Sequence, residues 1–224
     1  MSDTNVVFDS YEPFLAMWCG ADLEAGDLAR AMETVVAHKI PVVSVAPGAV
    51  PIIWPWLENE NVKIMARFYF QGKKVTDAQI SDVTVKINDA LRRGAHGAQV
   101  FLDVNALPGV VEQTHVIRDD LFFNKDLVVG LDILSVGPDD WDALYADLRK
   151  INASAVMFVL SKDEGKNSMF VGQVFAMLNA WSDSNKFDLH FAFGPNFMRI
   201  EQVLRMIKTM RPELIDGVRV FMNS

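Results

Sequence analysis

The chain has 224 residues, of which 50% are hydrophobic and 22% are charged, and its formal net charge is −8. These proportions exclude a disordered or collagen-like chain and indicate one folded domain spanning residues 1–224. The acidic balance disfavours nucleic acid or an anionic membrane surface as a partner. A single cysteine, Cys19, excludes an internal disulfide framework and suits a reducing compartment.

The start of the chain carries no export signal. Residues 1–10 contain no Lys or Arg, whereas a secretory signal begins with a basic region. The most apolar stretch, 49–57, is interrupted by Pro51 and Pro55 and is about half as long as a membrane span. We therefore predict a cytoplasmic protein that makes no membrane contact.

Short β-type runs alternate with longer helical patterns along the whole chain. Apolar runs predict eight strands, at 14–19, 41–46, 62–70, 98–104, 127–134, 154–160, 187–193 and 217–222. Apolar residues at helical spacing predict the intervening helices, at 23–39, a short piece through 54–57, 77–93, 110–121, 141–148, 171–178 and 200–207. Each connection is long enough for a crossover helix, so parallel strands are expected.

Eight parallel strands in a chain of this length predict a (β/α)8 TIM barrel. The competing open sheet is disfavoured, because no Gly-rich fingerprint follows the first strand. The last predicted strand ends two residues before Ser224, so the barrel is minimal and lacks the eighth helix. Either residues 2–13 or a second copy of the chain must then cover the apolar flank beside the eighth and first strands, and the second solution would be a homo-oligomer.

The C-terminal ends of the predicted strands are where such barrels place catalytic groups. Alternate residues of a strand face opposite sides, and this parity directs Arg67, Asp103 and His190 into the lumen. Asp132 lies near the end of the fifth strand. Further polar side chains that could hold a small-molecule substrate are expected nearby: Ser44, Gln99 and Asn105.

This set allows acid–base chemistry. His190 with Asp103 or Asp132 is a candidate general acid–base pair, and Arg67 is a cation for an anionic group. Structural roles are equally open, because Arg67 and Asp103 can neutralise each other and His190 can be a core histidine.

Lys162 follows the sixth strand and could form a Schiff base with a carbonyl substrate. Its charged neighbours Asp163, Glu164 and Lys166 also suit a solvated loop, where the lysine pKa would stay high. No His, Cys or carboxylate spacing resembles a metal site, and no cofactor is expected.

Six segments resemble 2-deoxyribose-5-phosphate aldolases in their order and spacing: 18–23, 43–47, 62–70, 94–95, 131–132 and 194–202. The resemblance spans about residues 15–224 and is one of pattern, with no single diagnostic motif. It implies a (β/α)8 class I aldolase with an imine-forming lysine on the sixth strand, a helper lysine on the seventh and an aspartate on the fourth. It also makes Gly194 and Asn196 candidates for substrate binding.

The three family positions hold other residues in this chain. Aligned without gaps, they fall on Met157, Ala192 and Gln99, and only a shift of several residues would bring Lys162 to the sixth-strand position. Asp132 matches an acidic position of the family on the fifth strand.

Three functions stay open. The first is an aldolase-like lyase for a small hydroxy-carbonyl or sugar-phosphate compound, with Lys162 as the imine former and Asp103 and His190 moving protons. The second is a diverged barrel that serves as a binding or interaction module. Its mouth would be filled by side chains such as Phe70, Phe101 and Phe158. The third is a lysine-independent acid–base enzyme that uses His190 and a carboxylate.

Overall fold

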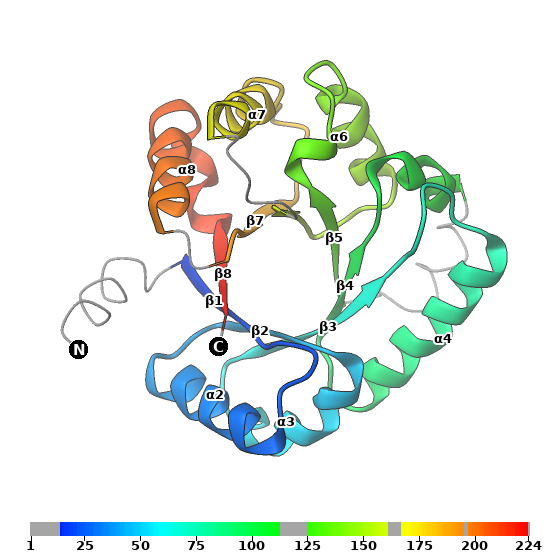
Figure 1. Ribbon diagram of the computed structural model, residues 1–224, viewed down its shortest axis with the longest axis vertical. Coiled ribbons are helices and arrows are strands. Elements are labelled where there is room, and N and C mark those ends of the chain that lie inside the picture. The colour runs from blue at the N-terminus through cyan, green and yellow to red at the C-terminus, as the bar shows by residue number, and fades with distance from the viewer. Residues whose placement is uncertain (1–13, 113–124, 161–166, 195–196, 224) are drawn as a thin grey trace.

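Eight parallel strands close into a barrel in the computed structural model, which describes residues 14–112, 125–160, 167–194 and 197–223. The strands pair in chain order, and β1 closes the ring against β8 (Figure 1). Their bounds are β1 Leu15–Trp18, β2 Val42–Val45, β3 Lys63–Tyr69, β4 Gly97–Phe101, β5 Asp126–Asp132, β6 Ala155–Val159, β7 Asp188–Ala192 and β8 Arg219–Asn223. The predicted (β/α)8 TIM barrel is confirmed.

The helices lie outside the ring of strands (Figure 1). Their bounds are α2 Ala25–Ala37, α3 Val50–Leu57, α4 Asp77–Arg92, α6 Trp141–Lys150, α7 Asn167–Asn179 and α8 Phe197–Met210. Residues 107–112 are helical too, and the rest of the helix predicted at 110–121 lies outside the described residues. The start of α4 shows how local sequence sets a boundary: the Thr76 hydroxyl accepts a hydrogen bond from the Gln79 N–H, and the Gln79 side chain accepts one from the Thr76 N–H.

Side chains alternate between two cores along every strand. The outward-facing residues pack against the helices; Phe158, for example, meets the ring of Trp141 at 5.5 Å. The inward-facing apolar residues form a smaller cluster in the lumen: Ala16, Val42, Met65, Phe101, Val128, Ala155, Met157 and Phe221. These residues come from seven of the eight strands, and Ala192 of β7 packs against them, so the lumen is a packed core as expected for a barrel of this class.

Two strands end earlier than the apolar pattern predicts, because an aspartate caps the turn that follows. β4 ends at Phe101, and the Asp103 carboxylate accepts a hydrogen bond of 2.9 Å from the Asn105 N–H at the start of the 3-10 turn Val104–Ala106. β5 ends at Asp132, whose carboxylate accepts one of 2.9 Å from the Leu134 N–H. Asp103 and Asn105 thus belong to a loop and not to the lumen face of a strand.

The flank at which β8 meets β1 is apolar and buried. Leu15 and Val220 pair across it and are 2% and 1% exposed. From α8, Lys208 reaches Phe14, with its Nζ 5.6 Å from the ring centroid. Residues 2–13, which were expected as one cover for this flank, lie outside the described residues. The homo-oligomer therefore stays a prediction.

Candidate functional site

Arg67 is the central polar residue of the C-terminal half of the lumen. It is 3% exposed and donates hydrogen bonds to the carbonyls of Cys19 and Ser44 and to the Ser44 hydroxyl, the last two at 2.9 and 3.1 Å. Burial lowers the pKa of its guanidinium, opposed by the nearby Tyr69 and Cys19. Arg67 therefore bonds to one carbonyl directly after β1 and to a carbonyl and a hydroxyl of β2. The alternative that Arg67 and Asp103 neutralise each other is not what the structure shows.

Aromatic rings close this half of the lumen above Arg67. The guanidinium lies against Trp18, with Cζ 4.2 Å from the ring centroid. Trp18 meets Phe101 edge-on at 5.5 Å, and Tyr69 stacks on Phe101 at 5.1 Å. Phe101 fits because β5 carries Gly130 opposite it; a Cβ there would lie 2.2 Å from the Phe101 ring.

Of the three rings expected to fill the mouth, only Phe101 faces the lumen. Phe70 and Phe158 belong to the outer core, where they pack with the helices. The expectation for Phe70 and Phe158 was therefore wrong, and Trp18 is the ring that packs against Phe101 in the lumen.

A layer of buried residues lies across the middle of the barrel. It consists of the third residue of each even-numbered strand, Ser44, Gln99, Met157 and Phe221, none of them more than 1% exposed. The Ser44 hydroxyl donates to the Gln99 side-chain oxygen. The Gln99 Nε2 is buried with no hydrogen-bond partner among the described residues. Four residues from alternate strands are the usual makeup of one layer in such a barrel.

Asp103 and Asp132 stand at the C-terminal ends of β4 and β5, as predicted, but both act first as caps. One oxygen of Asp103 accepts from both the backbone and the side-chain amide of Asn105, at 2.9 and 2.7 Å. Asp132 caps the turn after β5. Gly194 occupies a left-handed turn after β7 with φ of +64°. Lys162 and Asn196 lie outside the described residues.

His190 points into the lumen, as parity predicts, but lies at the opposite end from Asp103 and Asp132. It is the third residue of β7, stands 5.6 Å from the Phe221 ring between centroids, and lines a cavity at the N-terminal ends of the strands. The expected pairing with either aspartate at the C-terminal mouth is therefore not formed. Burial lowers the pKa of His190 to about 3, helped by Arg219 and Lys63, so the imidazole is neutral and a weak base.

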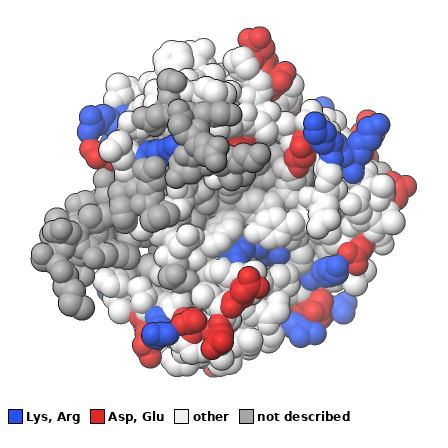
Figure 2. All heavy atoms as spheres, viewed as in Figure 1, with Lys and Arg blue, Asp and Glu red and all other residues white. Residues whose placement is uncertain are grey.

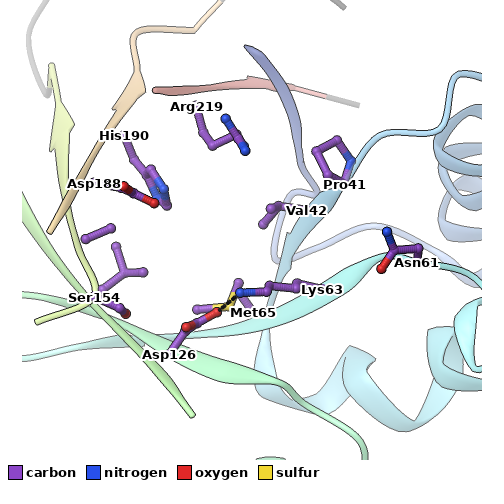
Figure 3. A pocket seen from close by; sticks show the side chains of 12 residues that line it. Pro41, Val42, Asn61, Lys63, Met65, Asp126, Ser154, Asp188, His190 and Arg219 are labelled. Carbon is purple, nitrogen blue, oxygen red and sulfur yellow. Dashed lines mark hydrogen bonds and ion pairs between the residues drawn. The ribbon is translucent and has the colours of Figure 1, made fainter. Parts of the chain in front are cut away.

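The cavity at the N-terminal mouth has a volume of about 210 Å³. Four charged residues surround it, and each is the first residue of its strand: Lys63, Asp126, Asp188 and Arg219. Lys63 and Asp126 form an ion pair of 2.6 Å (Figure 3). Burial raises the pKa of Asp188, and Arg219 opposes this shift.

Sequence reasoning missed this cluster. A charged residue that opens a strand usually marks a solvated strand end, and only the closure of the barrel brings four such ends to one mouth. The alternation of side chains nonetheless places Lys63 on the same face of β3 as Arg67, and His190 pairs with Arg219 on the neighbouring strand β8.

The described residues form no metal-binding cluster, and the face in Figure 2 carries no broad charged patch among them. On the face shown in Figure 2, acidic and basic side chains are interspersed around the rim, with no broad area of one sign among the described residues. Within the same residues, no three His, Cys, Asp or Glu side chains gather as a metal site would need. No described helix combines the length and the apolar character needed to cross a membrane.

The fold and the layered lumen define a (β/α)8 barrel. No family model matches the chain, and no curated protein matches it by sequence. Among solved structures, it is similar to a protein assigned as a deoxyribose-phosphate aldolase from Coccidioides immitis (TM-score 0.69, 12% identity, 93% of this chain and 79% of that chain). It is also similar to the tetrameric deoxyribose phosphate aldolase of Aeropyrum pernix (TM-score 0.67, 10% identity, 97% and 91%).

A third similar structure is a protein assigned as the copper homeostasis protein CutC from Streptococcus agalactiae (TM-score 0.65, 11% identity, 94% of this chain and 98% of that chain). At these identities the likeness concerns the fold alone, and proteins of different assigned function share it.

Proposed function

We propose that this protein is an aldolase-like lyase for small hydroxy-carbonyl compounds, with its reaction centre at the C-terminal mouth and Lys162 as the imine-forming amine. The observation that carries the proposal is the position of Asp103 and Asp132 at the C-terminal ends of two neighbouring strands, β4 and β5. Barrels of this class place their proton-transfer groups there. The similarity of the fold to that of aldolases supports the reaction type.

Lys162 is chosen because the lumen offers no amine at this end in the described part of β6 and β7. The inward-facing residues there are Val159 and Ala192, and Met157 lies one inward position below Val159. In the proposed reaction the Lys162 amine adds to the substrate carbonyl and water leaves. One carboxylate then accepts the proton of the substrate hydroxyl while the adjacent carbon–carbon bond breaks, which releases one carbonyl product, and its electrons pass to the protonated imine to give an enamine. Protonation of the enamine carbon and hydrolysis by water release the second product and free the lysine.

The remaining predicted substrate-binding residues divide into two groups. Asn105 and Gly194 belong to the turns that follow β4 and β7, and these two residues together with Asn196 are proposed to contact the substrate. Arg67, Ser44 and Gln99 bond to one another or to backbone beneath Trp18. A role for these three in binding requires Trp18 to swing away.

A second candidate function is a non-catalytic binding module. The observation that favours it is the closure of the C-terminal half of the lumen by Trp18, Phe101 and Tyr69. Met157, which holds the sixth-strand lysine position of the aldolase pattern, is fully buried. For the third alternative, acid–base chemistry by His190 and a carboxylate, the carboxylate beside His190 is Asp188 and not Asp103 or Asp132.

Borohydride trapping separates the two candidates. The wild-type protein is incubated with acetaldehyde, pyruvate or 2-deoxyribose-5-phosphate and reduced, and the adduct is located by intact-mass and peptide mass spectrometry. The lyase proposal expects one adduct on Lys162, which disappears in Lys162→Met and persists in the control Lys166→Met. Absence of an adduct with all three compounds would overturn the proposal and leave the binding module.

A further inference from the structure

The cavity at the N-terminal mouth is a formed site at the end of the barrel remote from the proposed reaction centre. Its apolar floor lies inside the lumen and is made of Val42, Met65, Val128 and Ala155. Its polar wall is made of the charged first residues of four strands together with His190. An apolar surface with a few convergent polar groups is the usual construction of a small-molecule site.

Two of the four charges form an ion pair, and the other two interact only at longer range. Lys63 and Asp126 are joined by their ion pair, whereas no ion pair joins Arg219 to Asp188. Among the described residues, the Arg219 guanidinium donates to the carbonyls of Asp216 and Val218 alone, and no donor bonds to the Asp188 carboxylate. Arg219 is half-buried and Asp188 is exposed at the rim of the same cavity, and with no ion pair between them each can take a charge of opposite sign from a ligand.

His190 adds an unsatisfied polar atom to the same wall. The side chain is 8% exposed, and its Nδ1 is buried with no hydrogen-bond partner among the described residues. Figure 3 shows His190 and Asp188 beside each other, with Arg219 entering from β8 and the Lys63–Asp126 pair on the other side of the cavity. Neutral imidazole offers one donor and one acceptor, so a ligand carboxylate or amine can satisfy it.

We propose that the N-terminal mouth binds a small aliphatic zwitterion with the chemistry of a free α-amino acid. Its carboxylate pairs with Arg219, its ammonium pairs with Asp188, and its apolar tail lies on the floor that contains Met65. The proposal does not rest on the lyase function, since the site shares no residue with the C-terminal mouth.

The test uses L-leucine as the probe and two analogues that each lack one charge. These are 4-methylpentanoate, which lacks the ammonium group, and 3-methylbutylamine, which lacks the carboxylate. Binding is followed by NMR of ¹³C-methyl methionine, with the Met65 signal assigned through Met65→Leu. L-leucine is expected to shift the Met65 methyl signal in a saturable way and to leave that of Met198, 66% exposed on α8, unchanged. Each analogue is expected to bind at least about tenfold more weakly, because it lacks one charge-assisted pair.

Two substitutions test the partners in the wall. Asp188→Asn and Arg219→Gln are each expected to weaken L-leucine binding about tenfold or more. The matched controls, Asp82→Asn on α4 and Arg205→Gln on α8, remove one member of an exposed ion pair and should leave the affinity unchanged.

Three results would overturn the proposal. They are the absence of a Met65 shift at the solubility limit of L-leucine, equally tight binding of either analogue, and wild-type affinity in both wall variants. If a wall variant fails to fold, the comparison of L-leucine with its analogues on the wild-type protein still decides the question.

Discussion

The indole of Trp18 lies over the guanidinium of Arg67, 4.2 Å from Cζ to the ring centroid, and this contact closes the C-terminal half of the lumen. A cation held against an aromatic face and satisfied by carbonyl oxygens is stable without a carboxylate partner. Arg67 thus joins β1, β2 and β3, and its first role is structural.

Replacing Arg67 with Met tests this role. The substitution removes the Arg67 donor from the Cys19 carbonyl and one of the two donors of the Ser44 carbonyl, so the free energy of unfolding should fall by about 2–4 kcal/mol. Urea denaturation measures it. Arg205→Met, at an exposed ion pair on α8, is the control and should change stability by less than about 0.5 kcal/mol. An Arg67 variant as stable as the wild type would contradict the structural role.

Gly130→Ala should destabilise the barrel by about 1–3 kcal/mol, because the new methyl group meets the Phe101 ring at 2.2 Å. Gly172→Ala on α7 is the control, because the added Cβ there has nothing within 4 Å. Its free energy of unfolding should rise by up to about 1 kcal/mol, since alanine favours the helix more than glycine does. Thermal and urea unfolding report both. Adding Phe101→Leu should relieve part of the Gly130→Ala cost, and strict additivity in the double-mutant cycle would show that the two residues do not clash.

Ser44 and Gln99 should show strong coupling. Ser44→Ala removes a donor from the Gln99 amide, which is already unsatisfied at Nε2, and should cost about 1–3 kcal/mol. In the double variant Ser44→Ala, Gln99→Met the orphaned amide is gone as well, so it should be more stable than Ser44→Ala alone. Urea midpoints measure the difference, and a double variant that is less stable than the single one would refute the assignment.

His190 should make the protein lose stability in mild acid. Its pKa is about 3 in the folded chain and near 6.5 when unfolded, so between these values the unfolded state binds the proton more readily. Stability should therefore fall as the pH drops below about 6.5, by about 2–3 kcal/mol at pH 4.5 from this residue. Urea midpoints from pH 7 to 4.5 should show this slope in the wild type and a flatter one in His190→Gln.

The acid effect has an opposing term within the same cavity. The pKa of Asp188 is raised by burial, so its contribution changes in the opposite direction, falling as the pH rises through the folded pKa. Lys63, Asp126 and Arg219 also face the cavity. Repeating the titration in Asp188→Asn should steepen the His190 slope, and an unchanged slope in His190→Gln would contradict the assignment.

The fold could be predicted from sequence because each strand carries a local signal that does not depend on the rest of the chain. All eight predicted strands are present within a few residues of their expected bounds. The parity of the lumen was also predictable, since alternation is a local property of a strand. Arg67, Gln99 and His190 point inward as expected.

The height of a residue along the barrel axis was not predictable in the same way. It depends on how the strands shift against one another around the ring, and on caps such as Asp103 and Asp132 that end two strands early. His190 was therefore assigned to the wrong end. The meeting of Trp18 with Phe101 depends on strands far apart in sequence, and no local pattern indicates it.

The cavity at the N-terminal mouth is lined neither by the buried layer of Ser44, Gln99, Met157 and Phe221 nor by residues of the C-terminal loops. Substitutions in the cavity wall and substitutions in those loops therefore change different surfaces of the barrel. Ligand preference at one end can change while every residue that forms the other end stays the same.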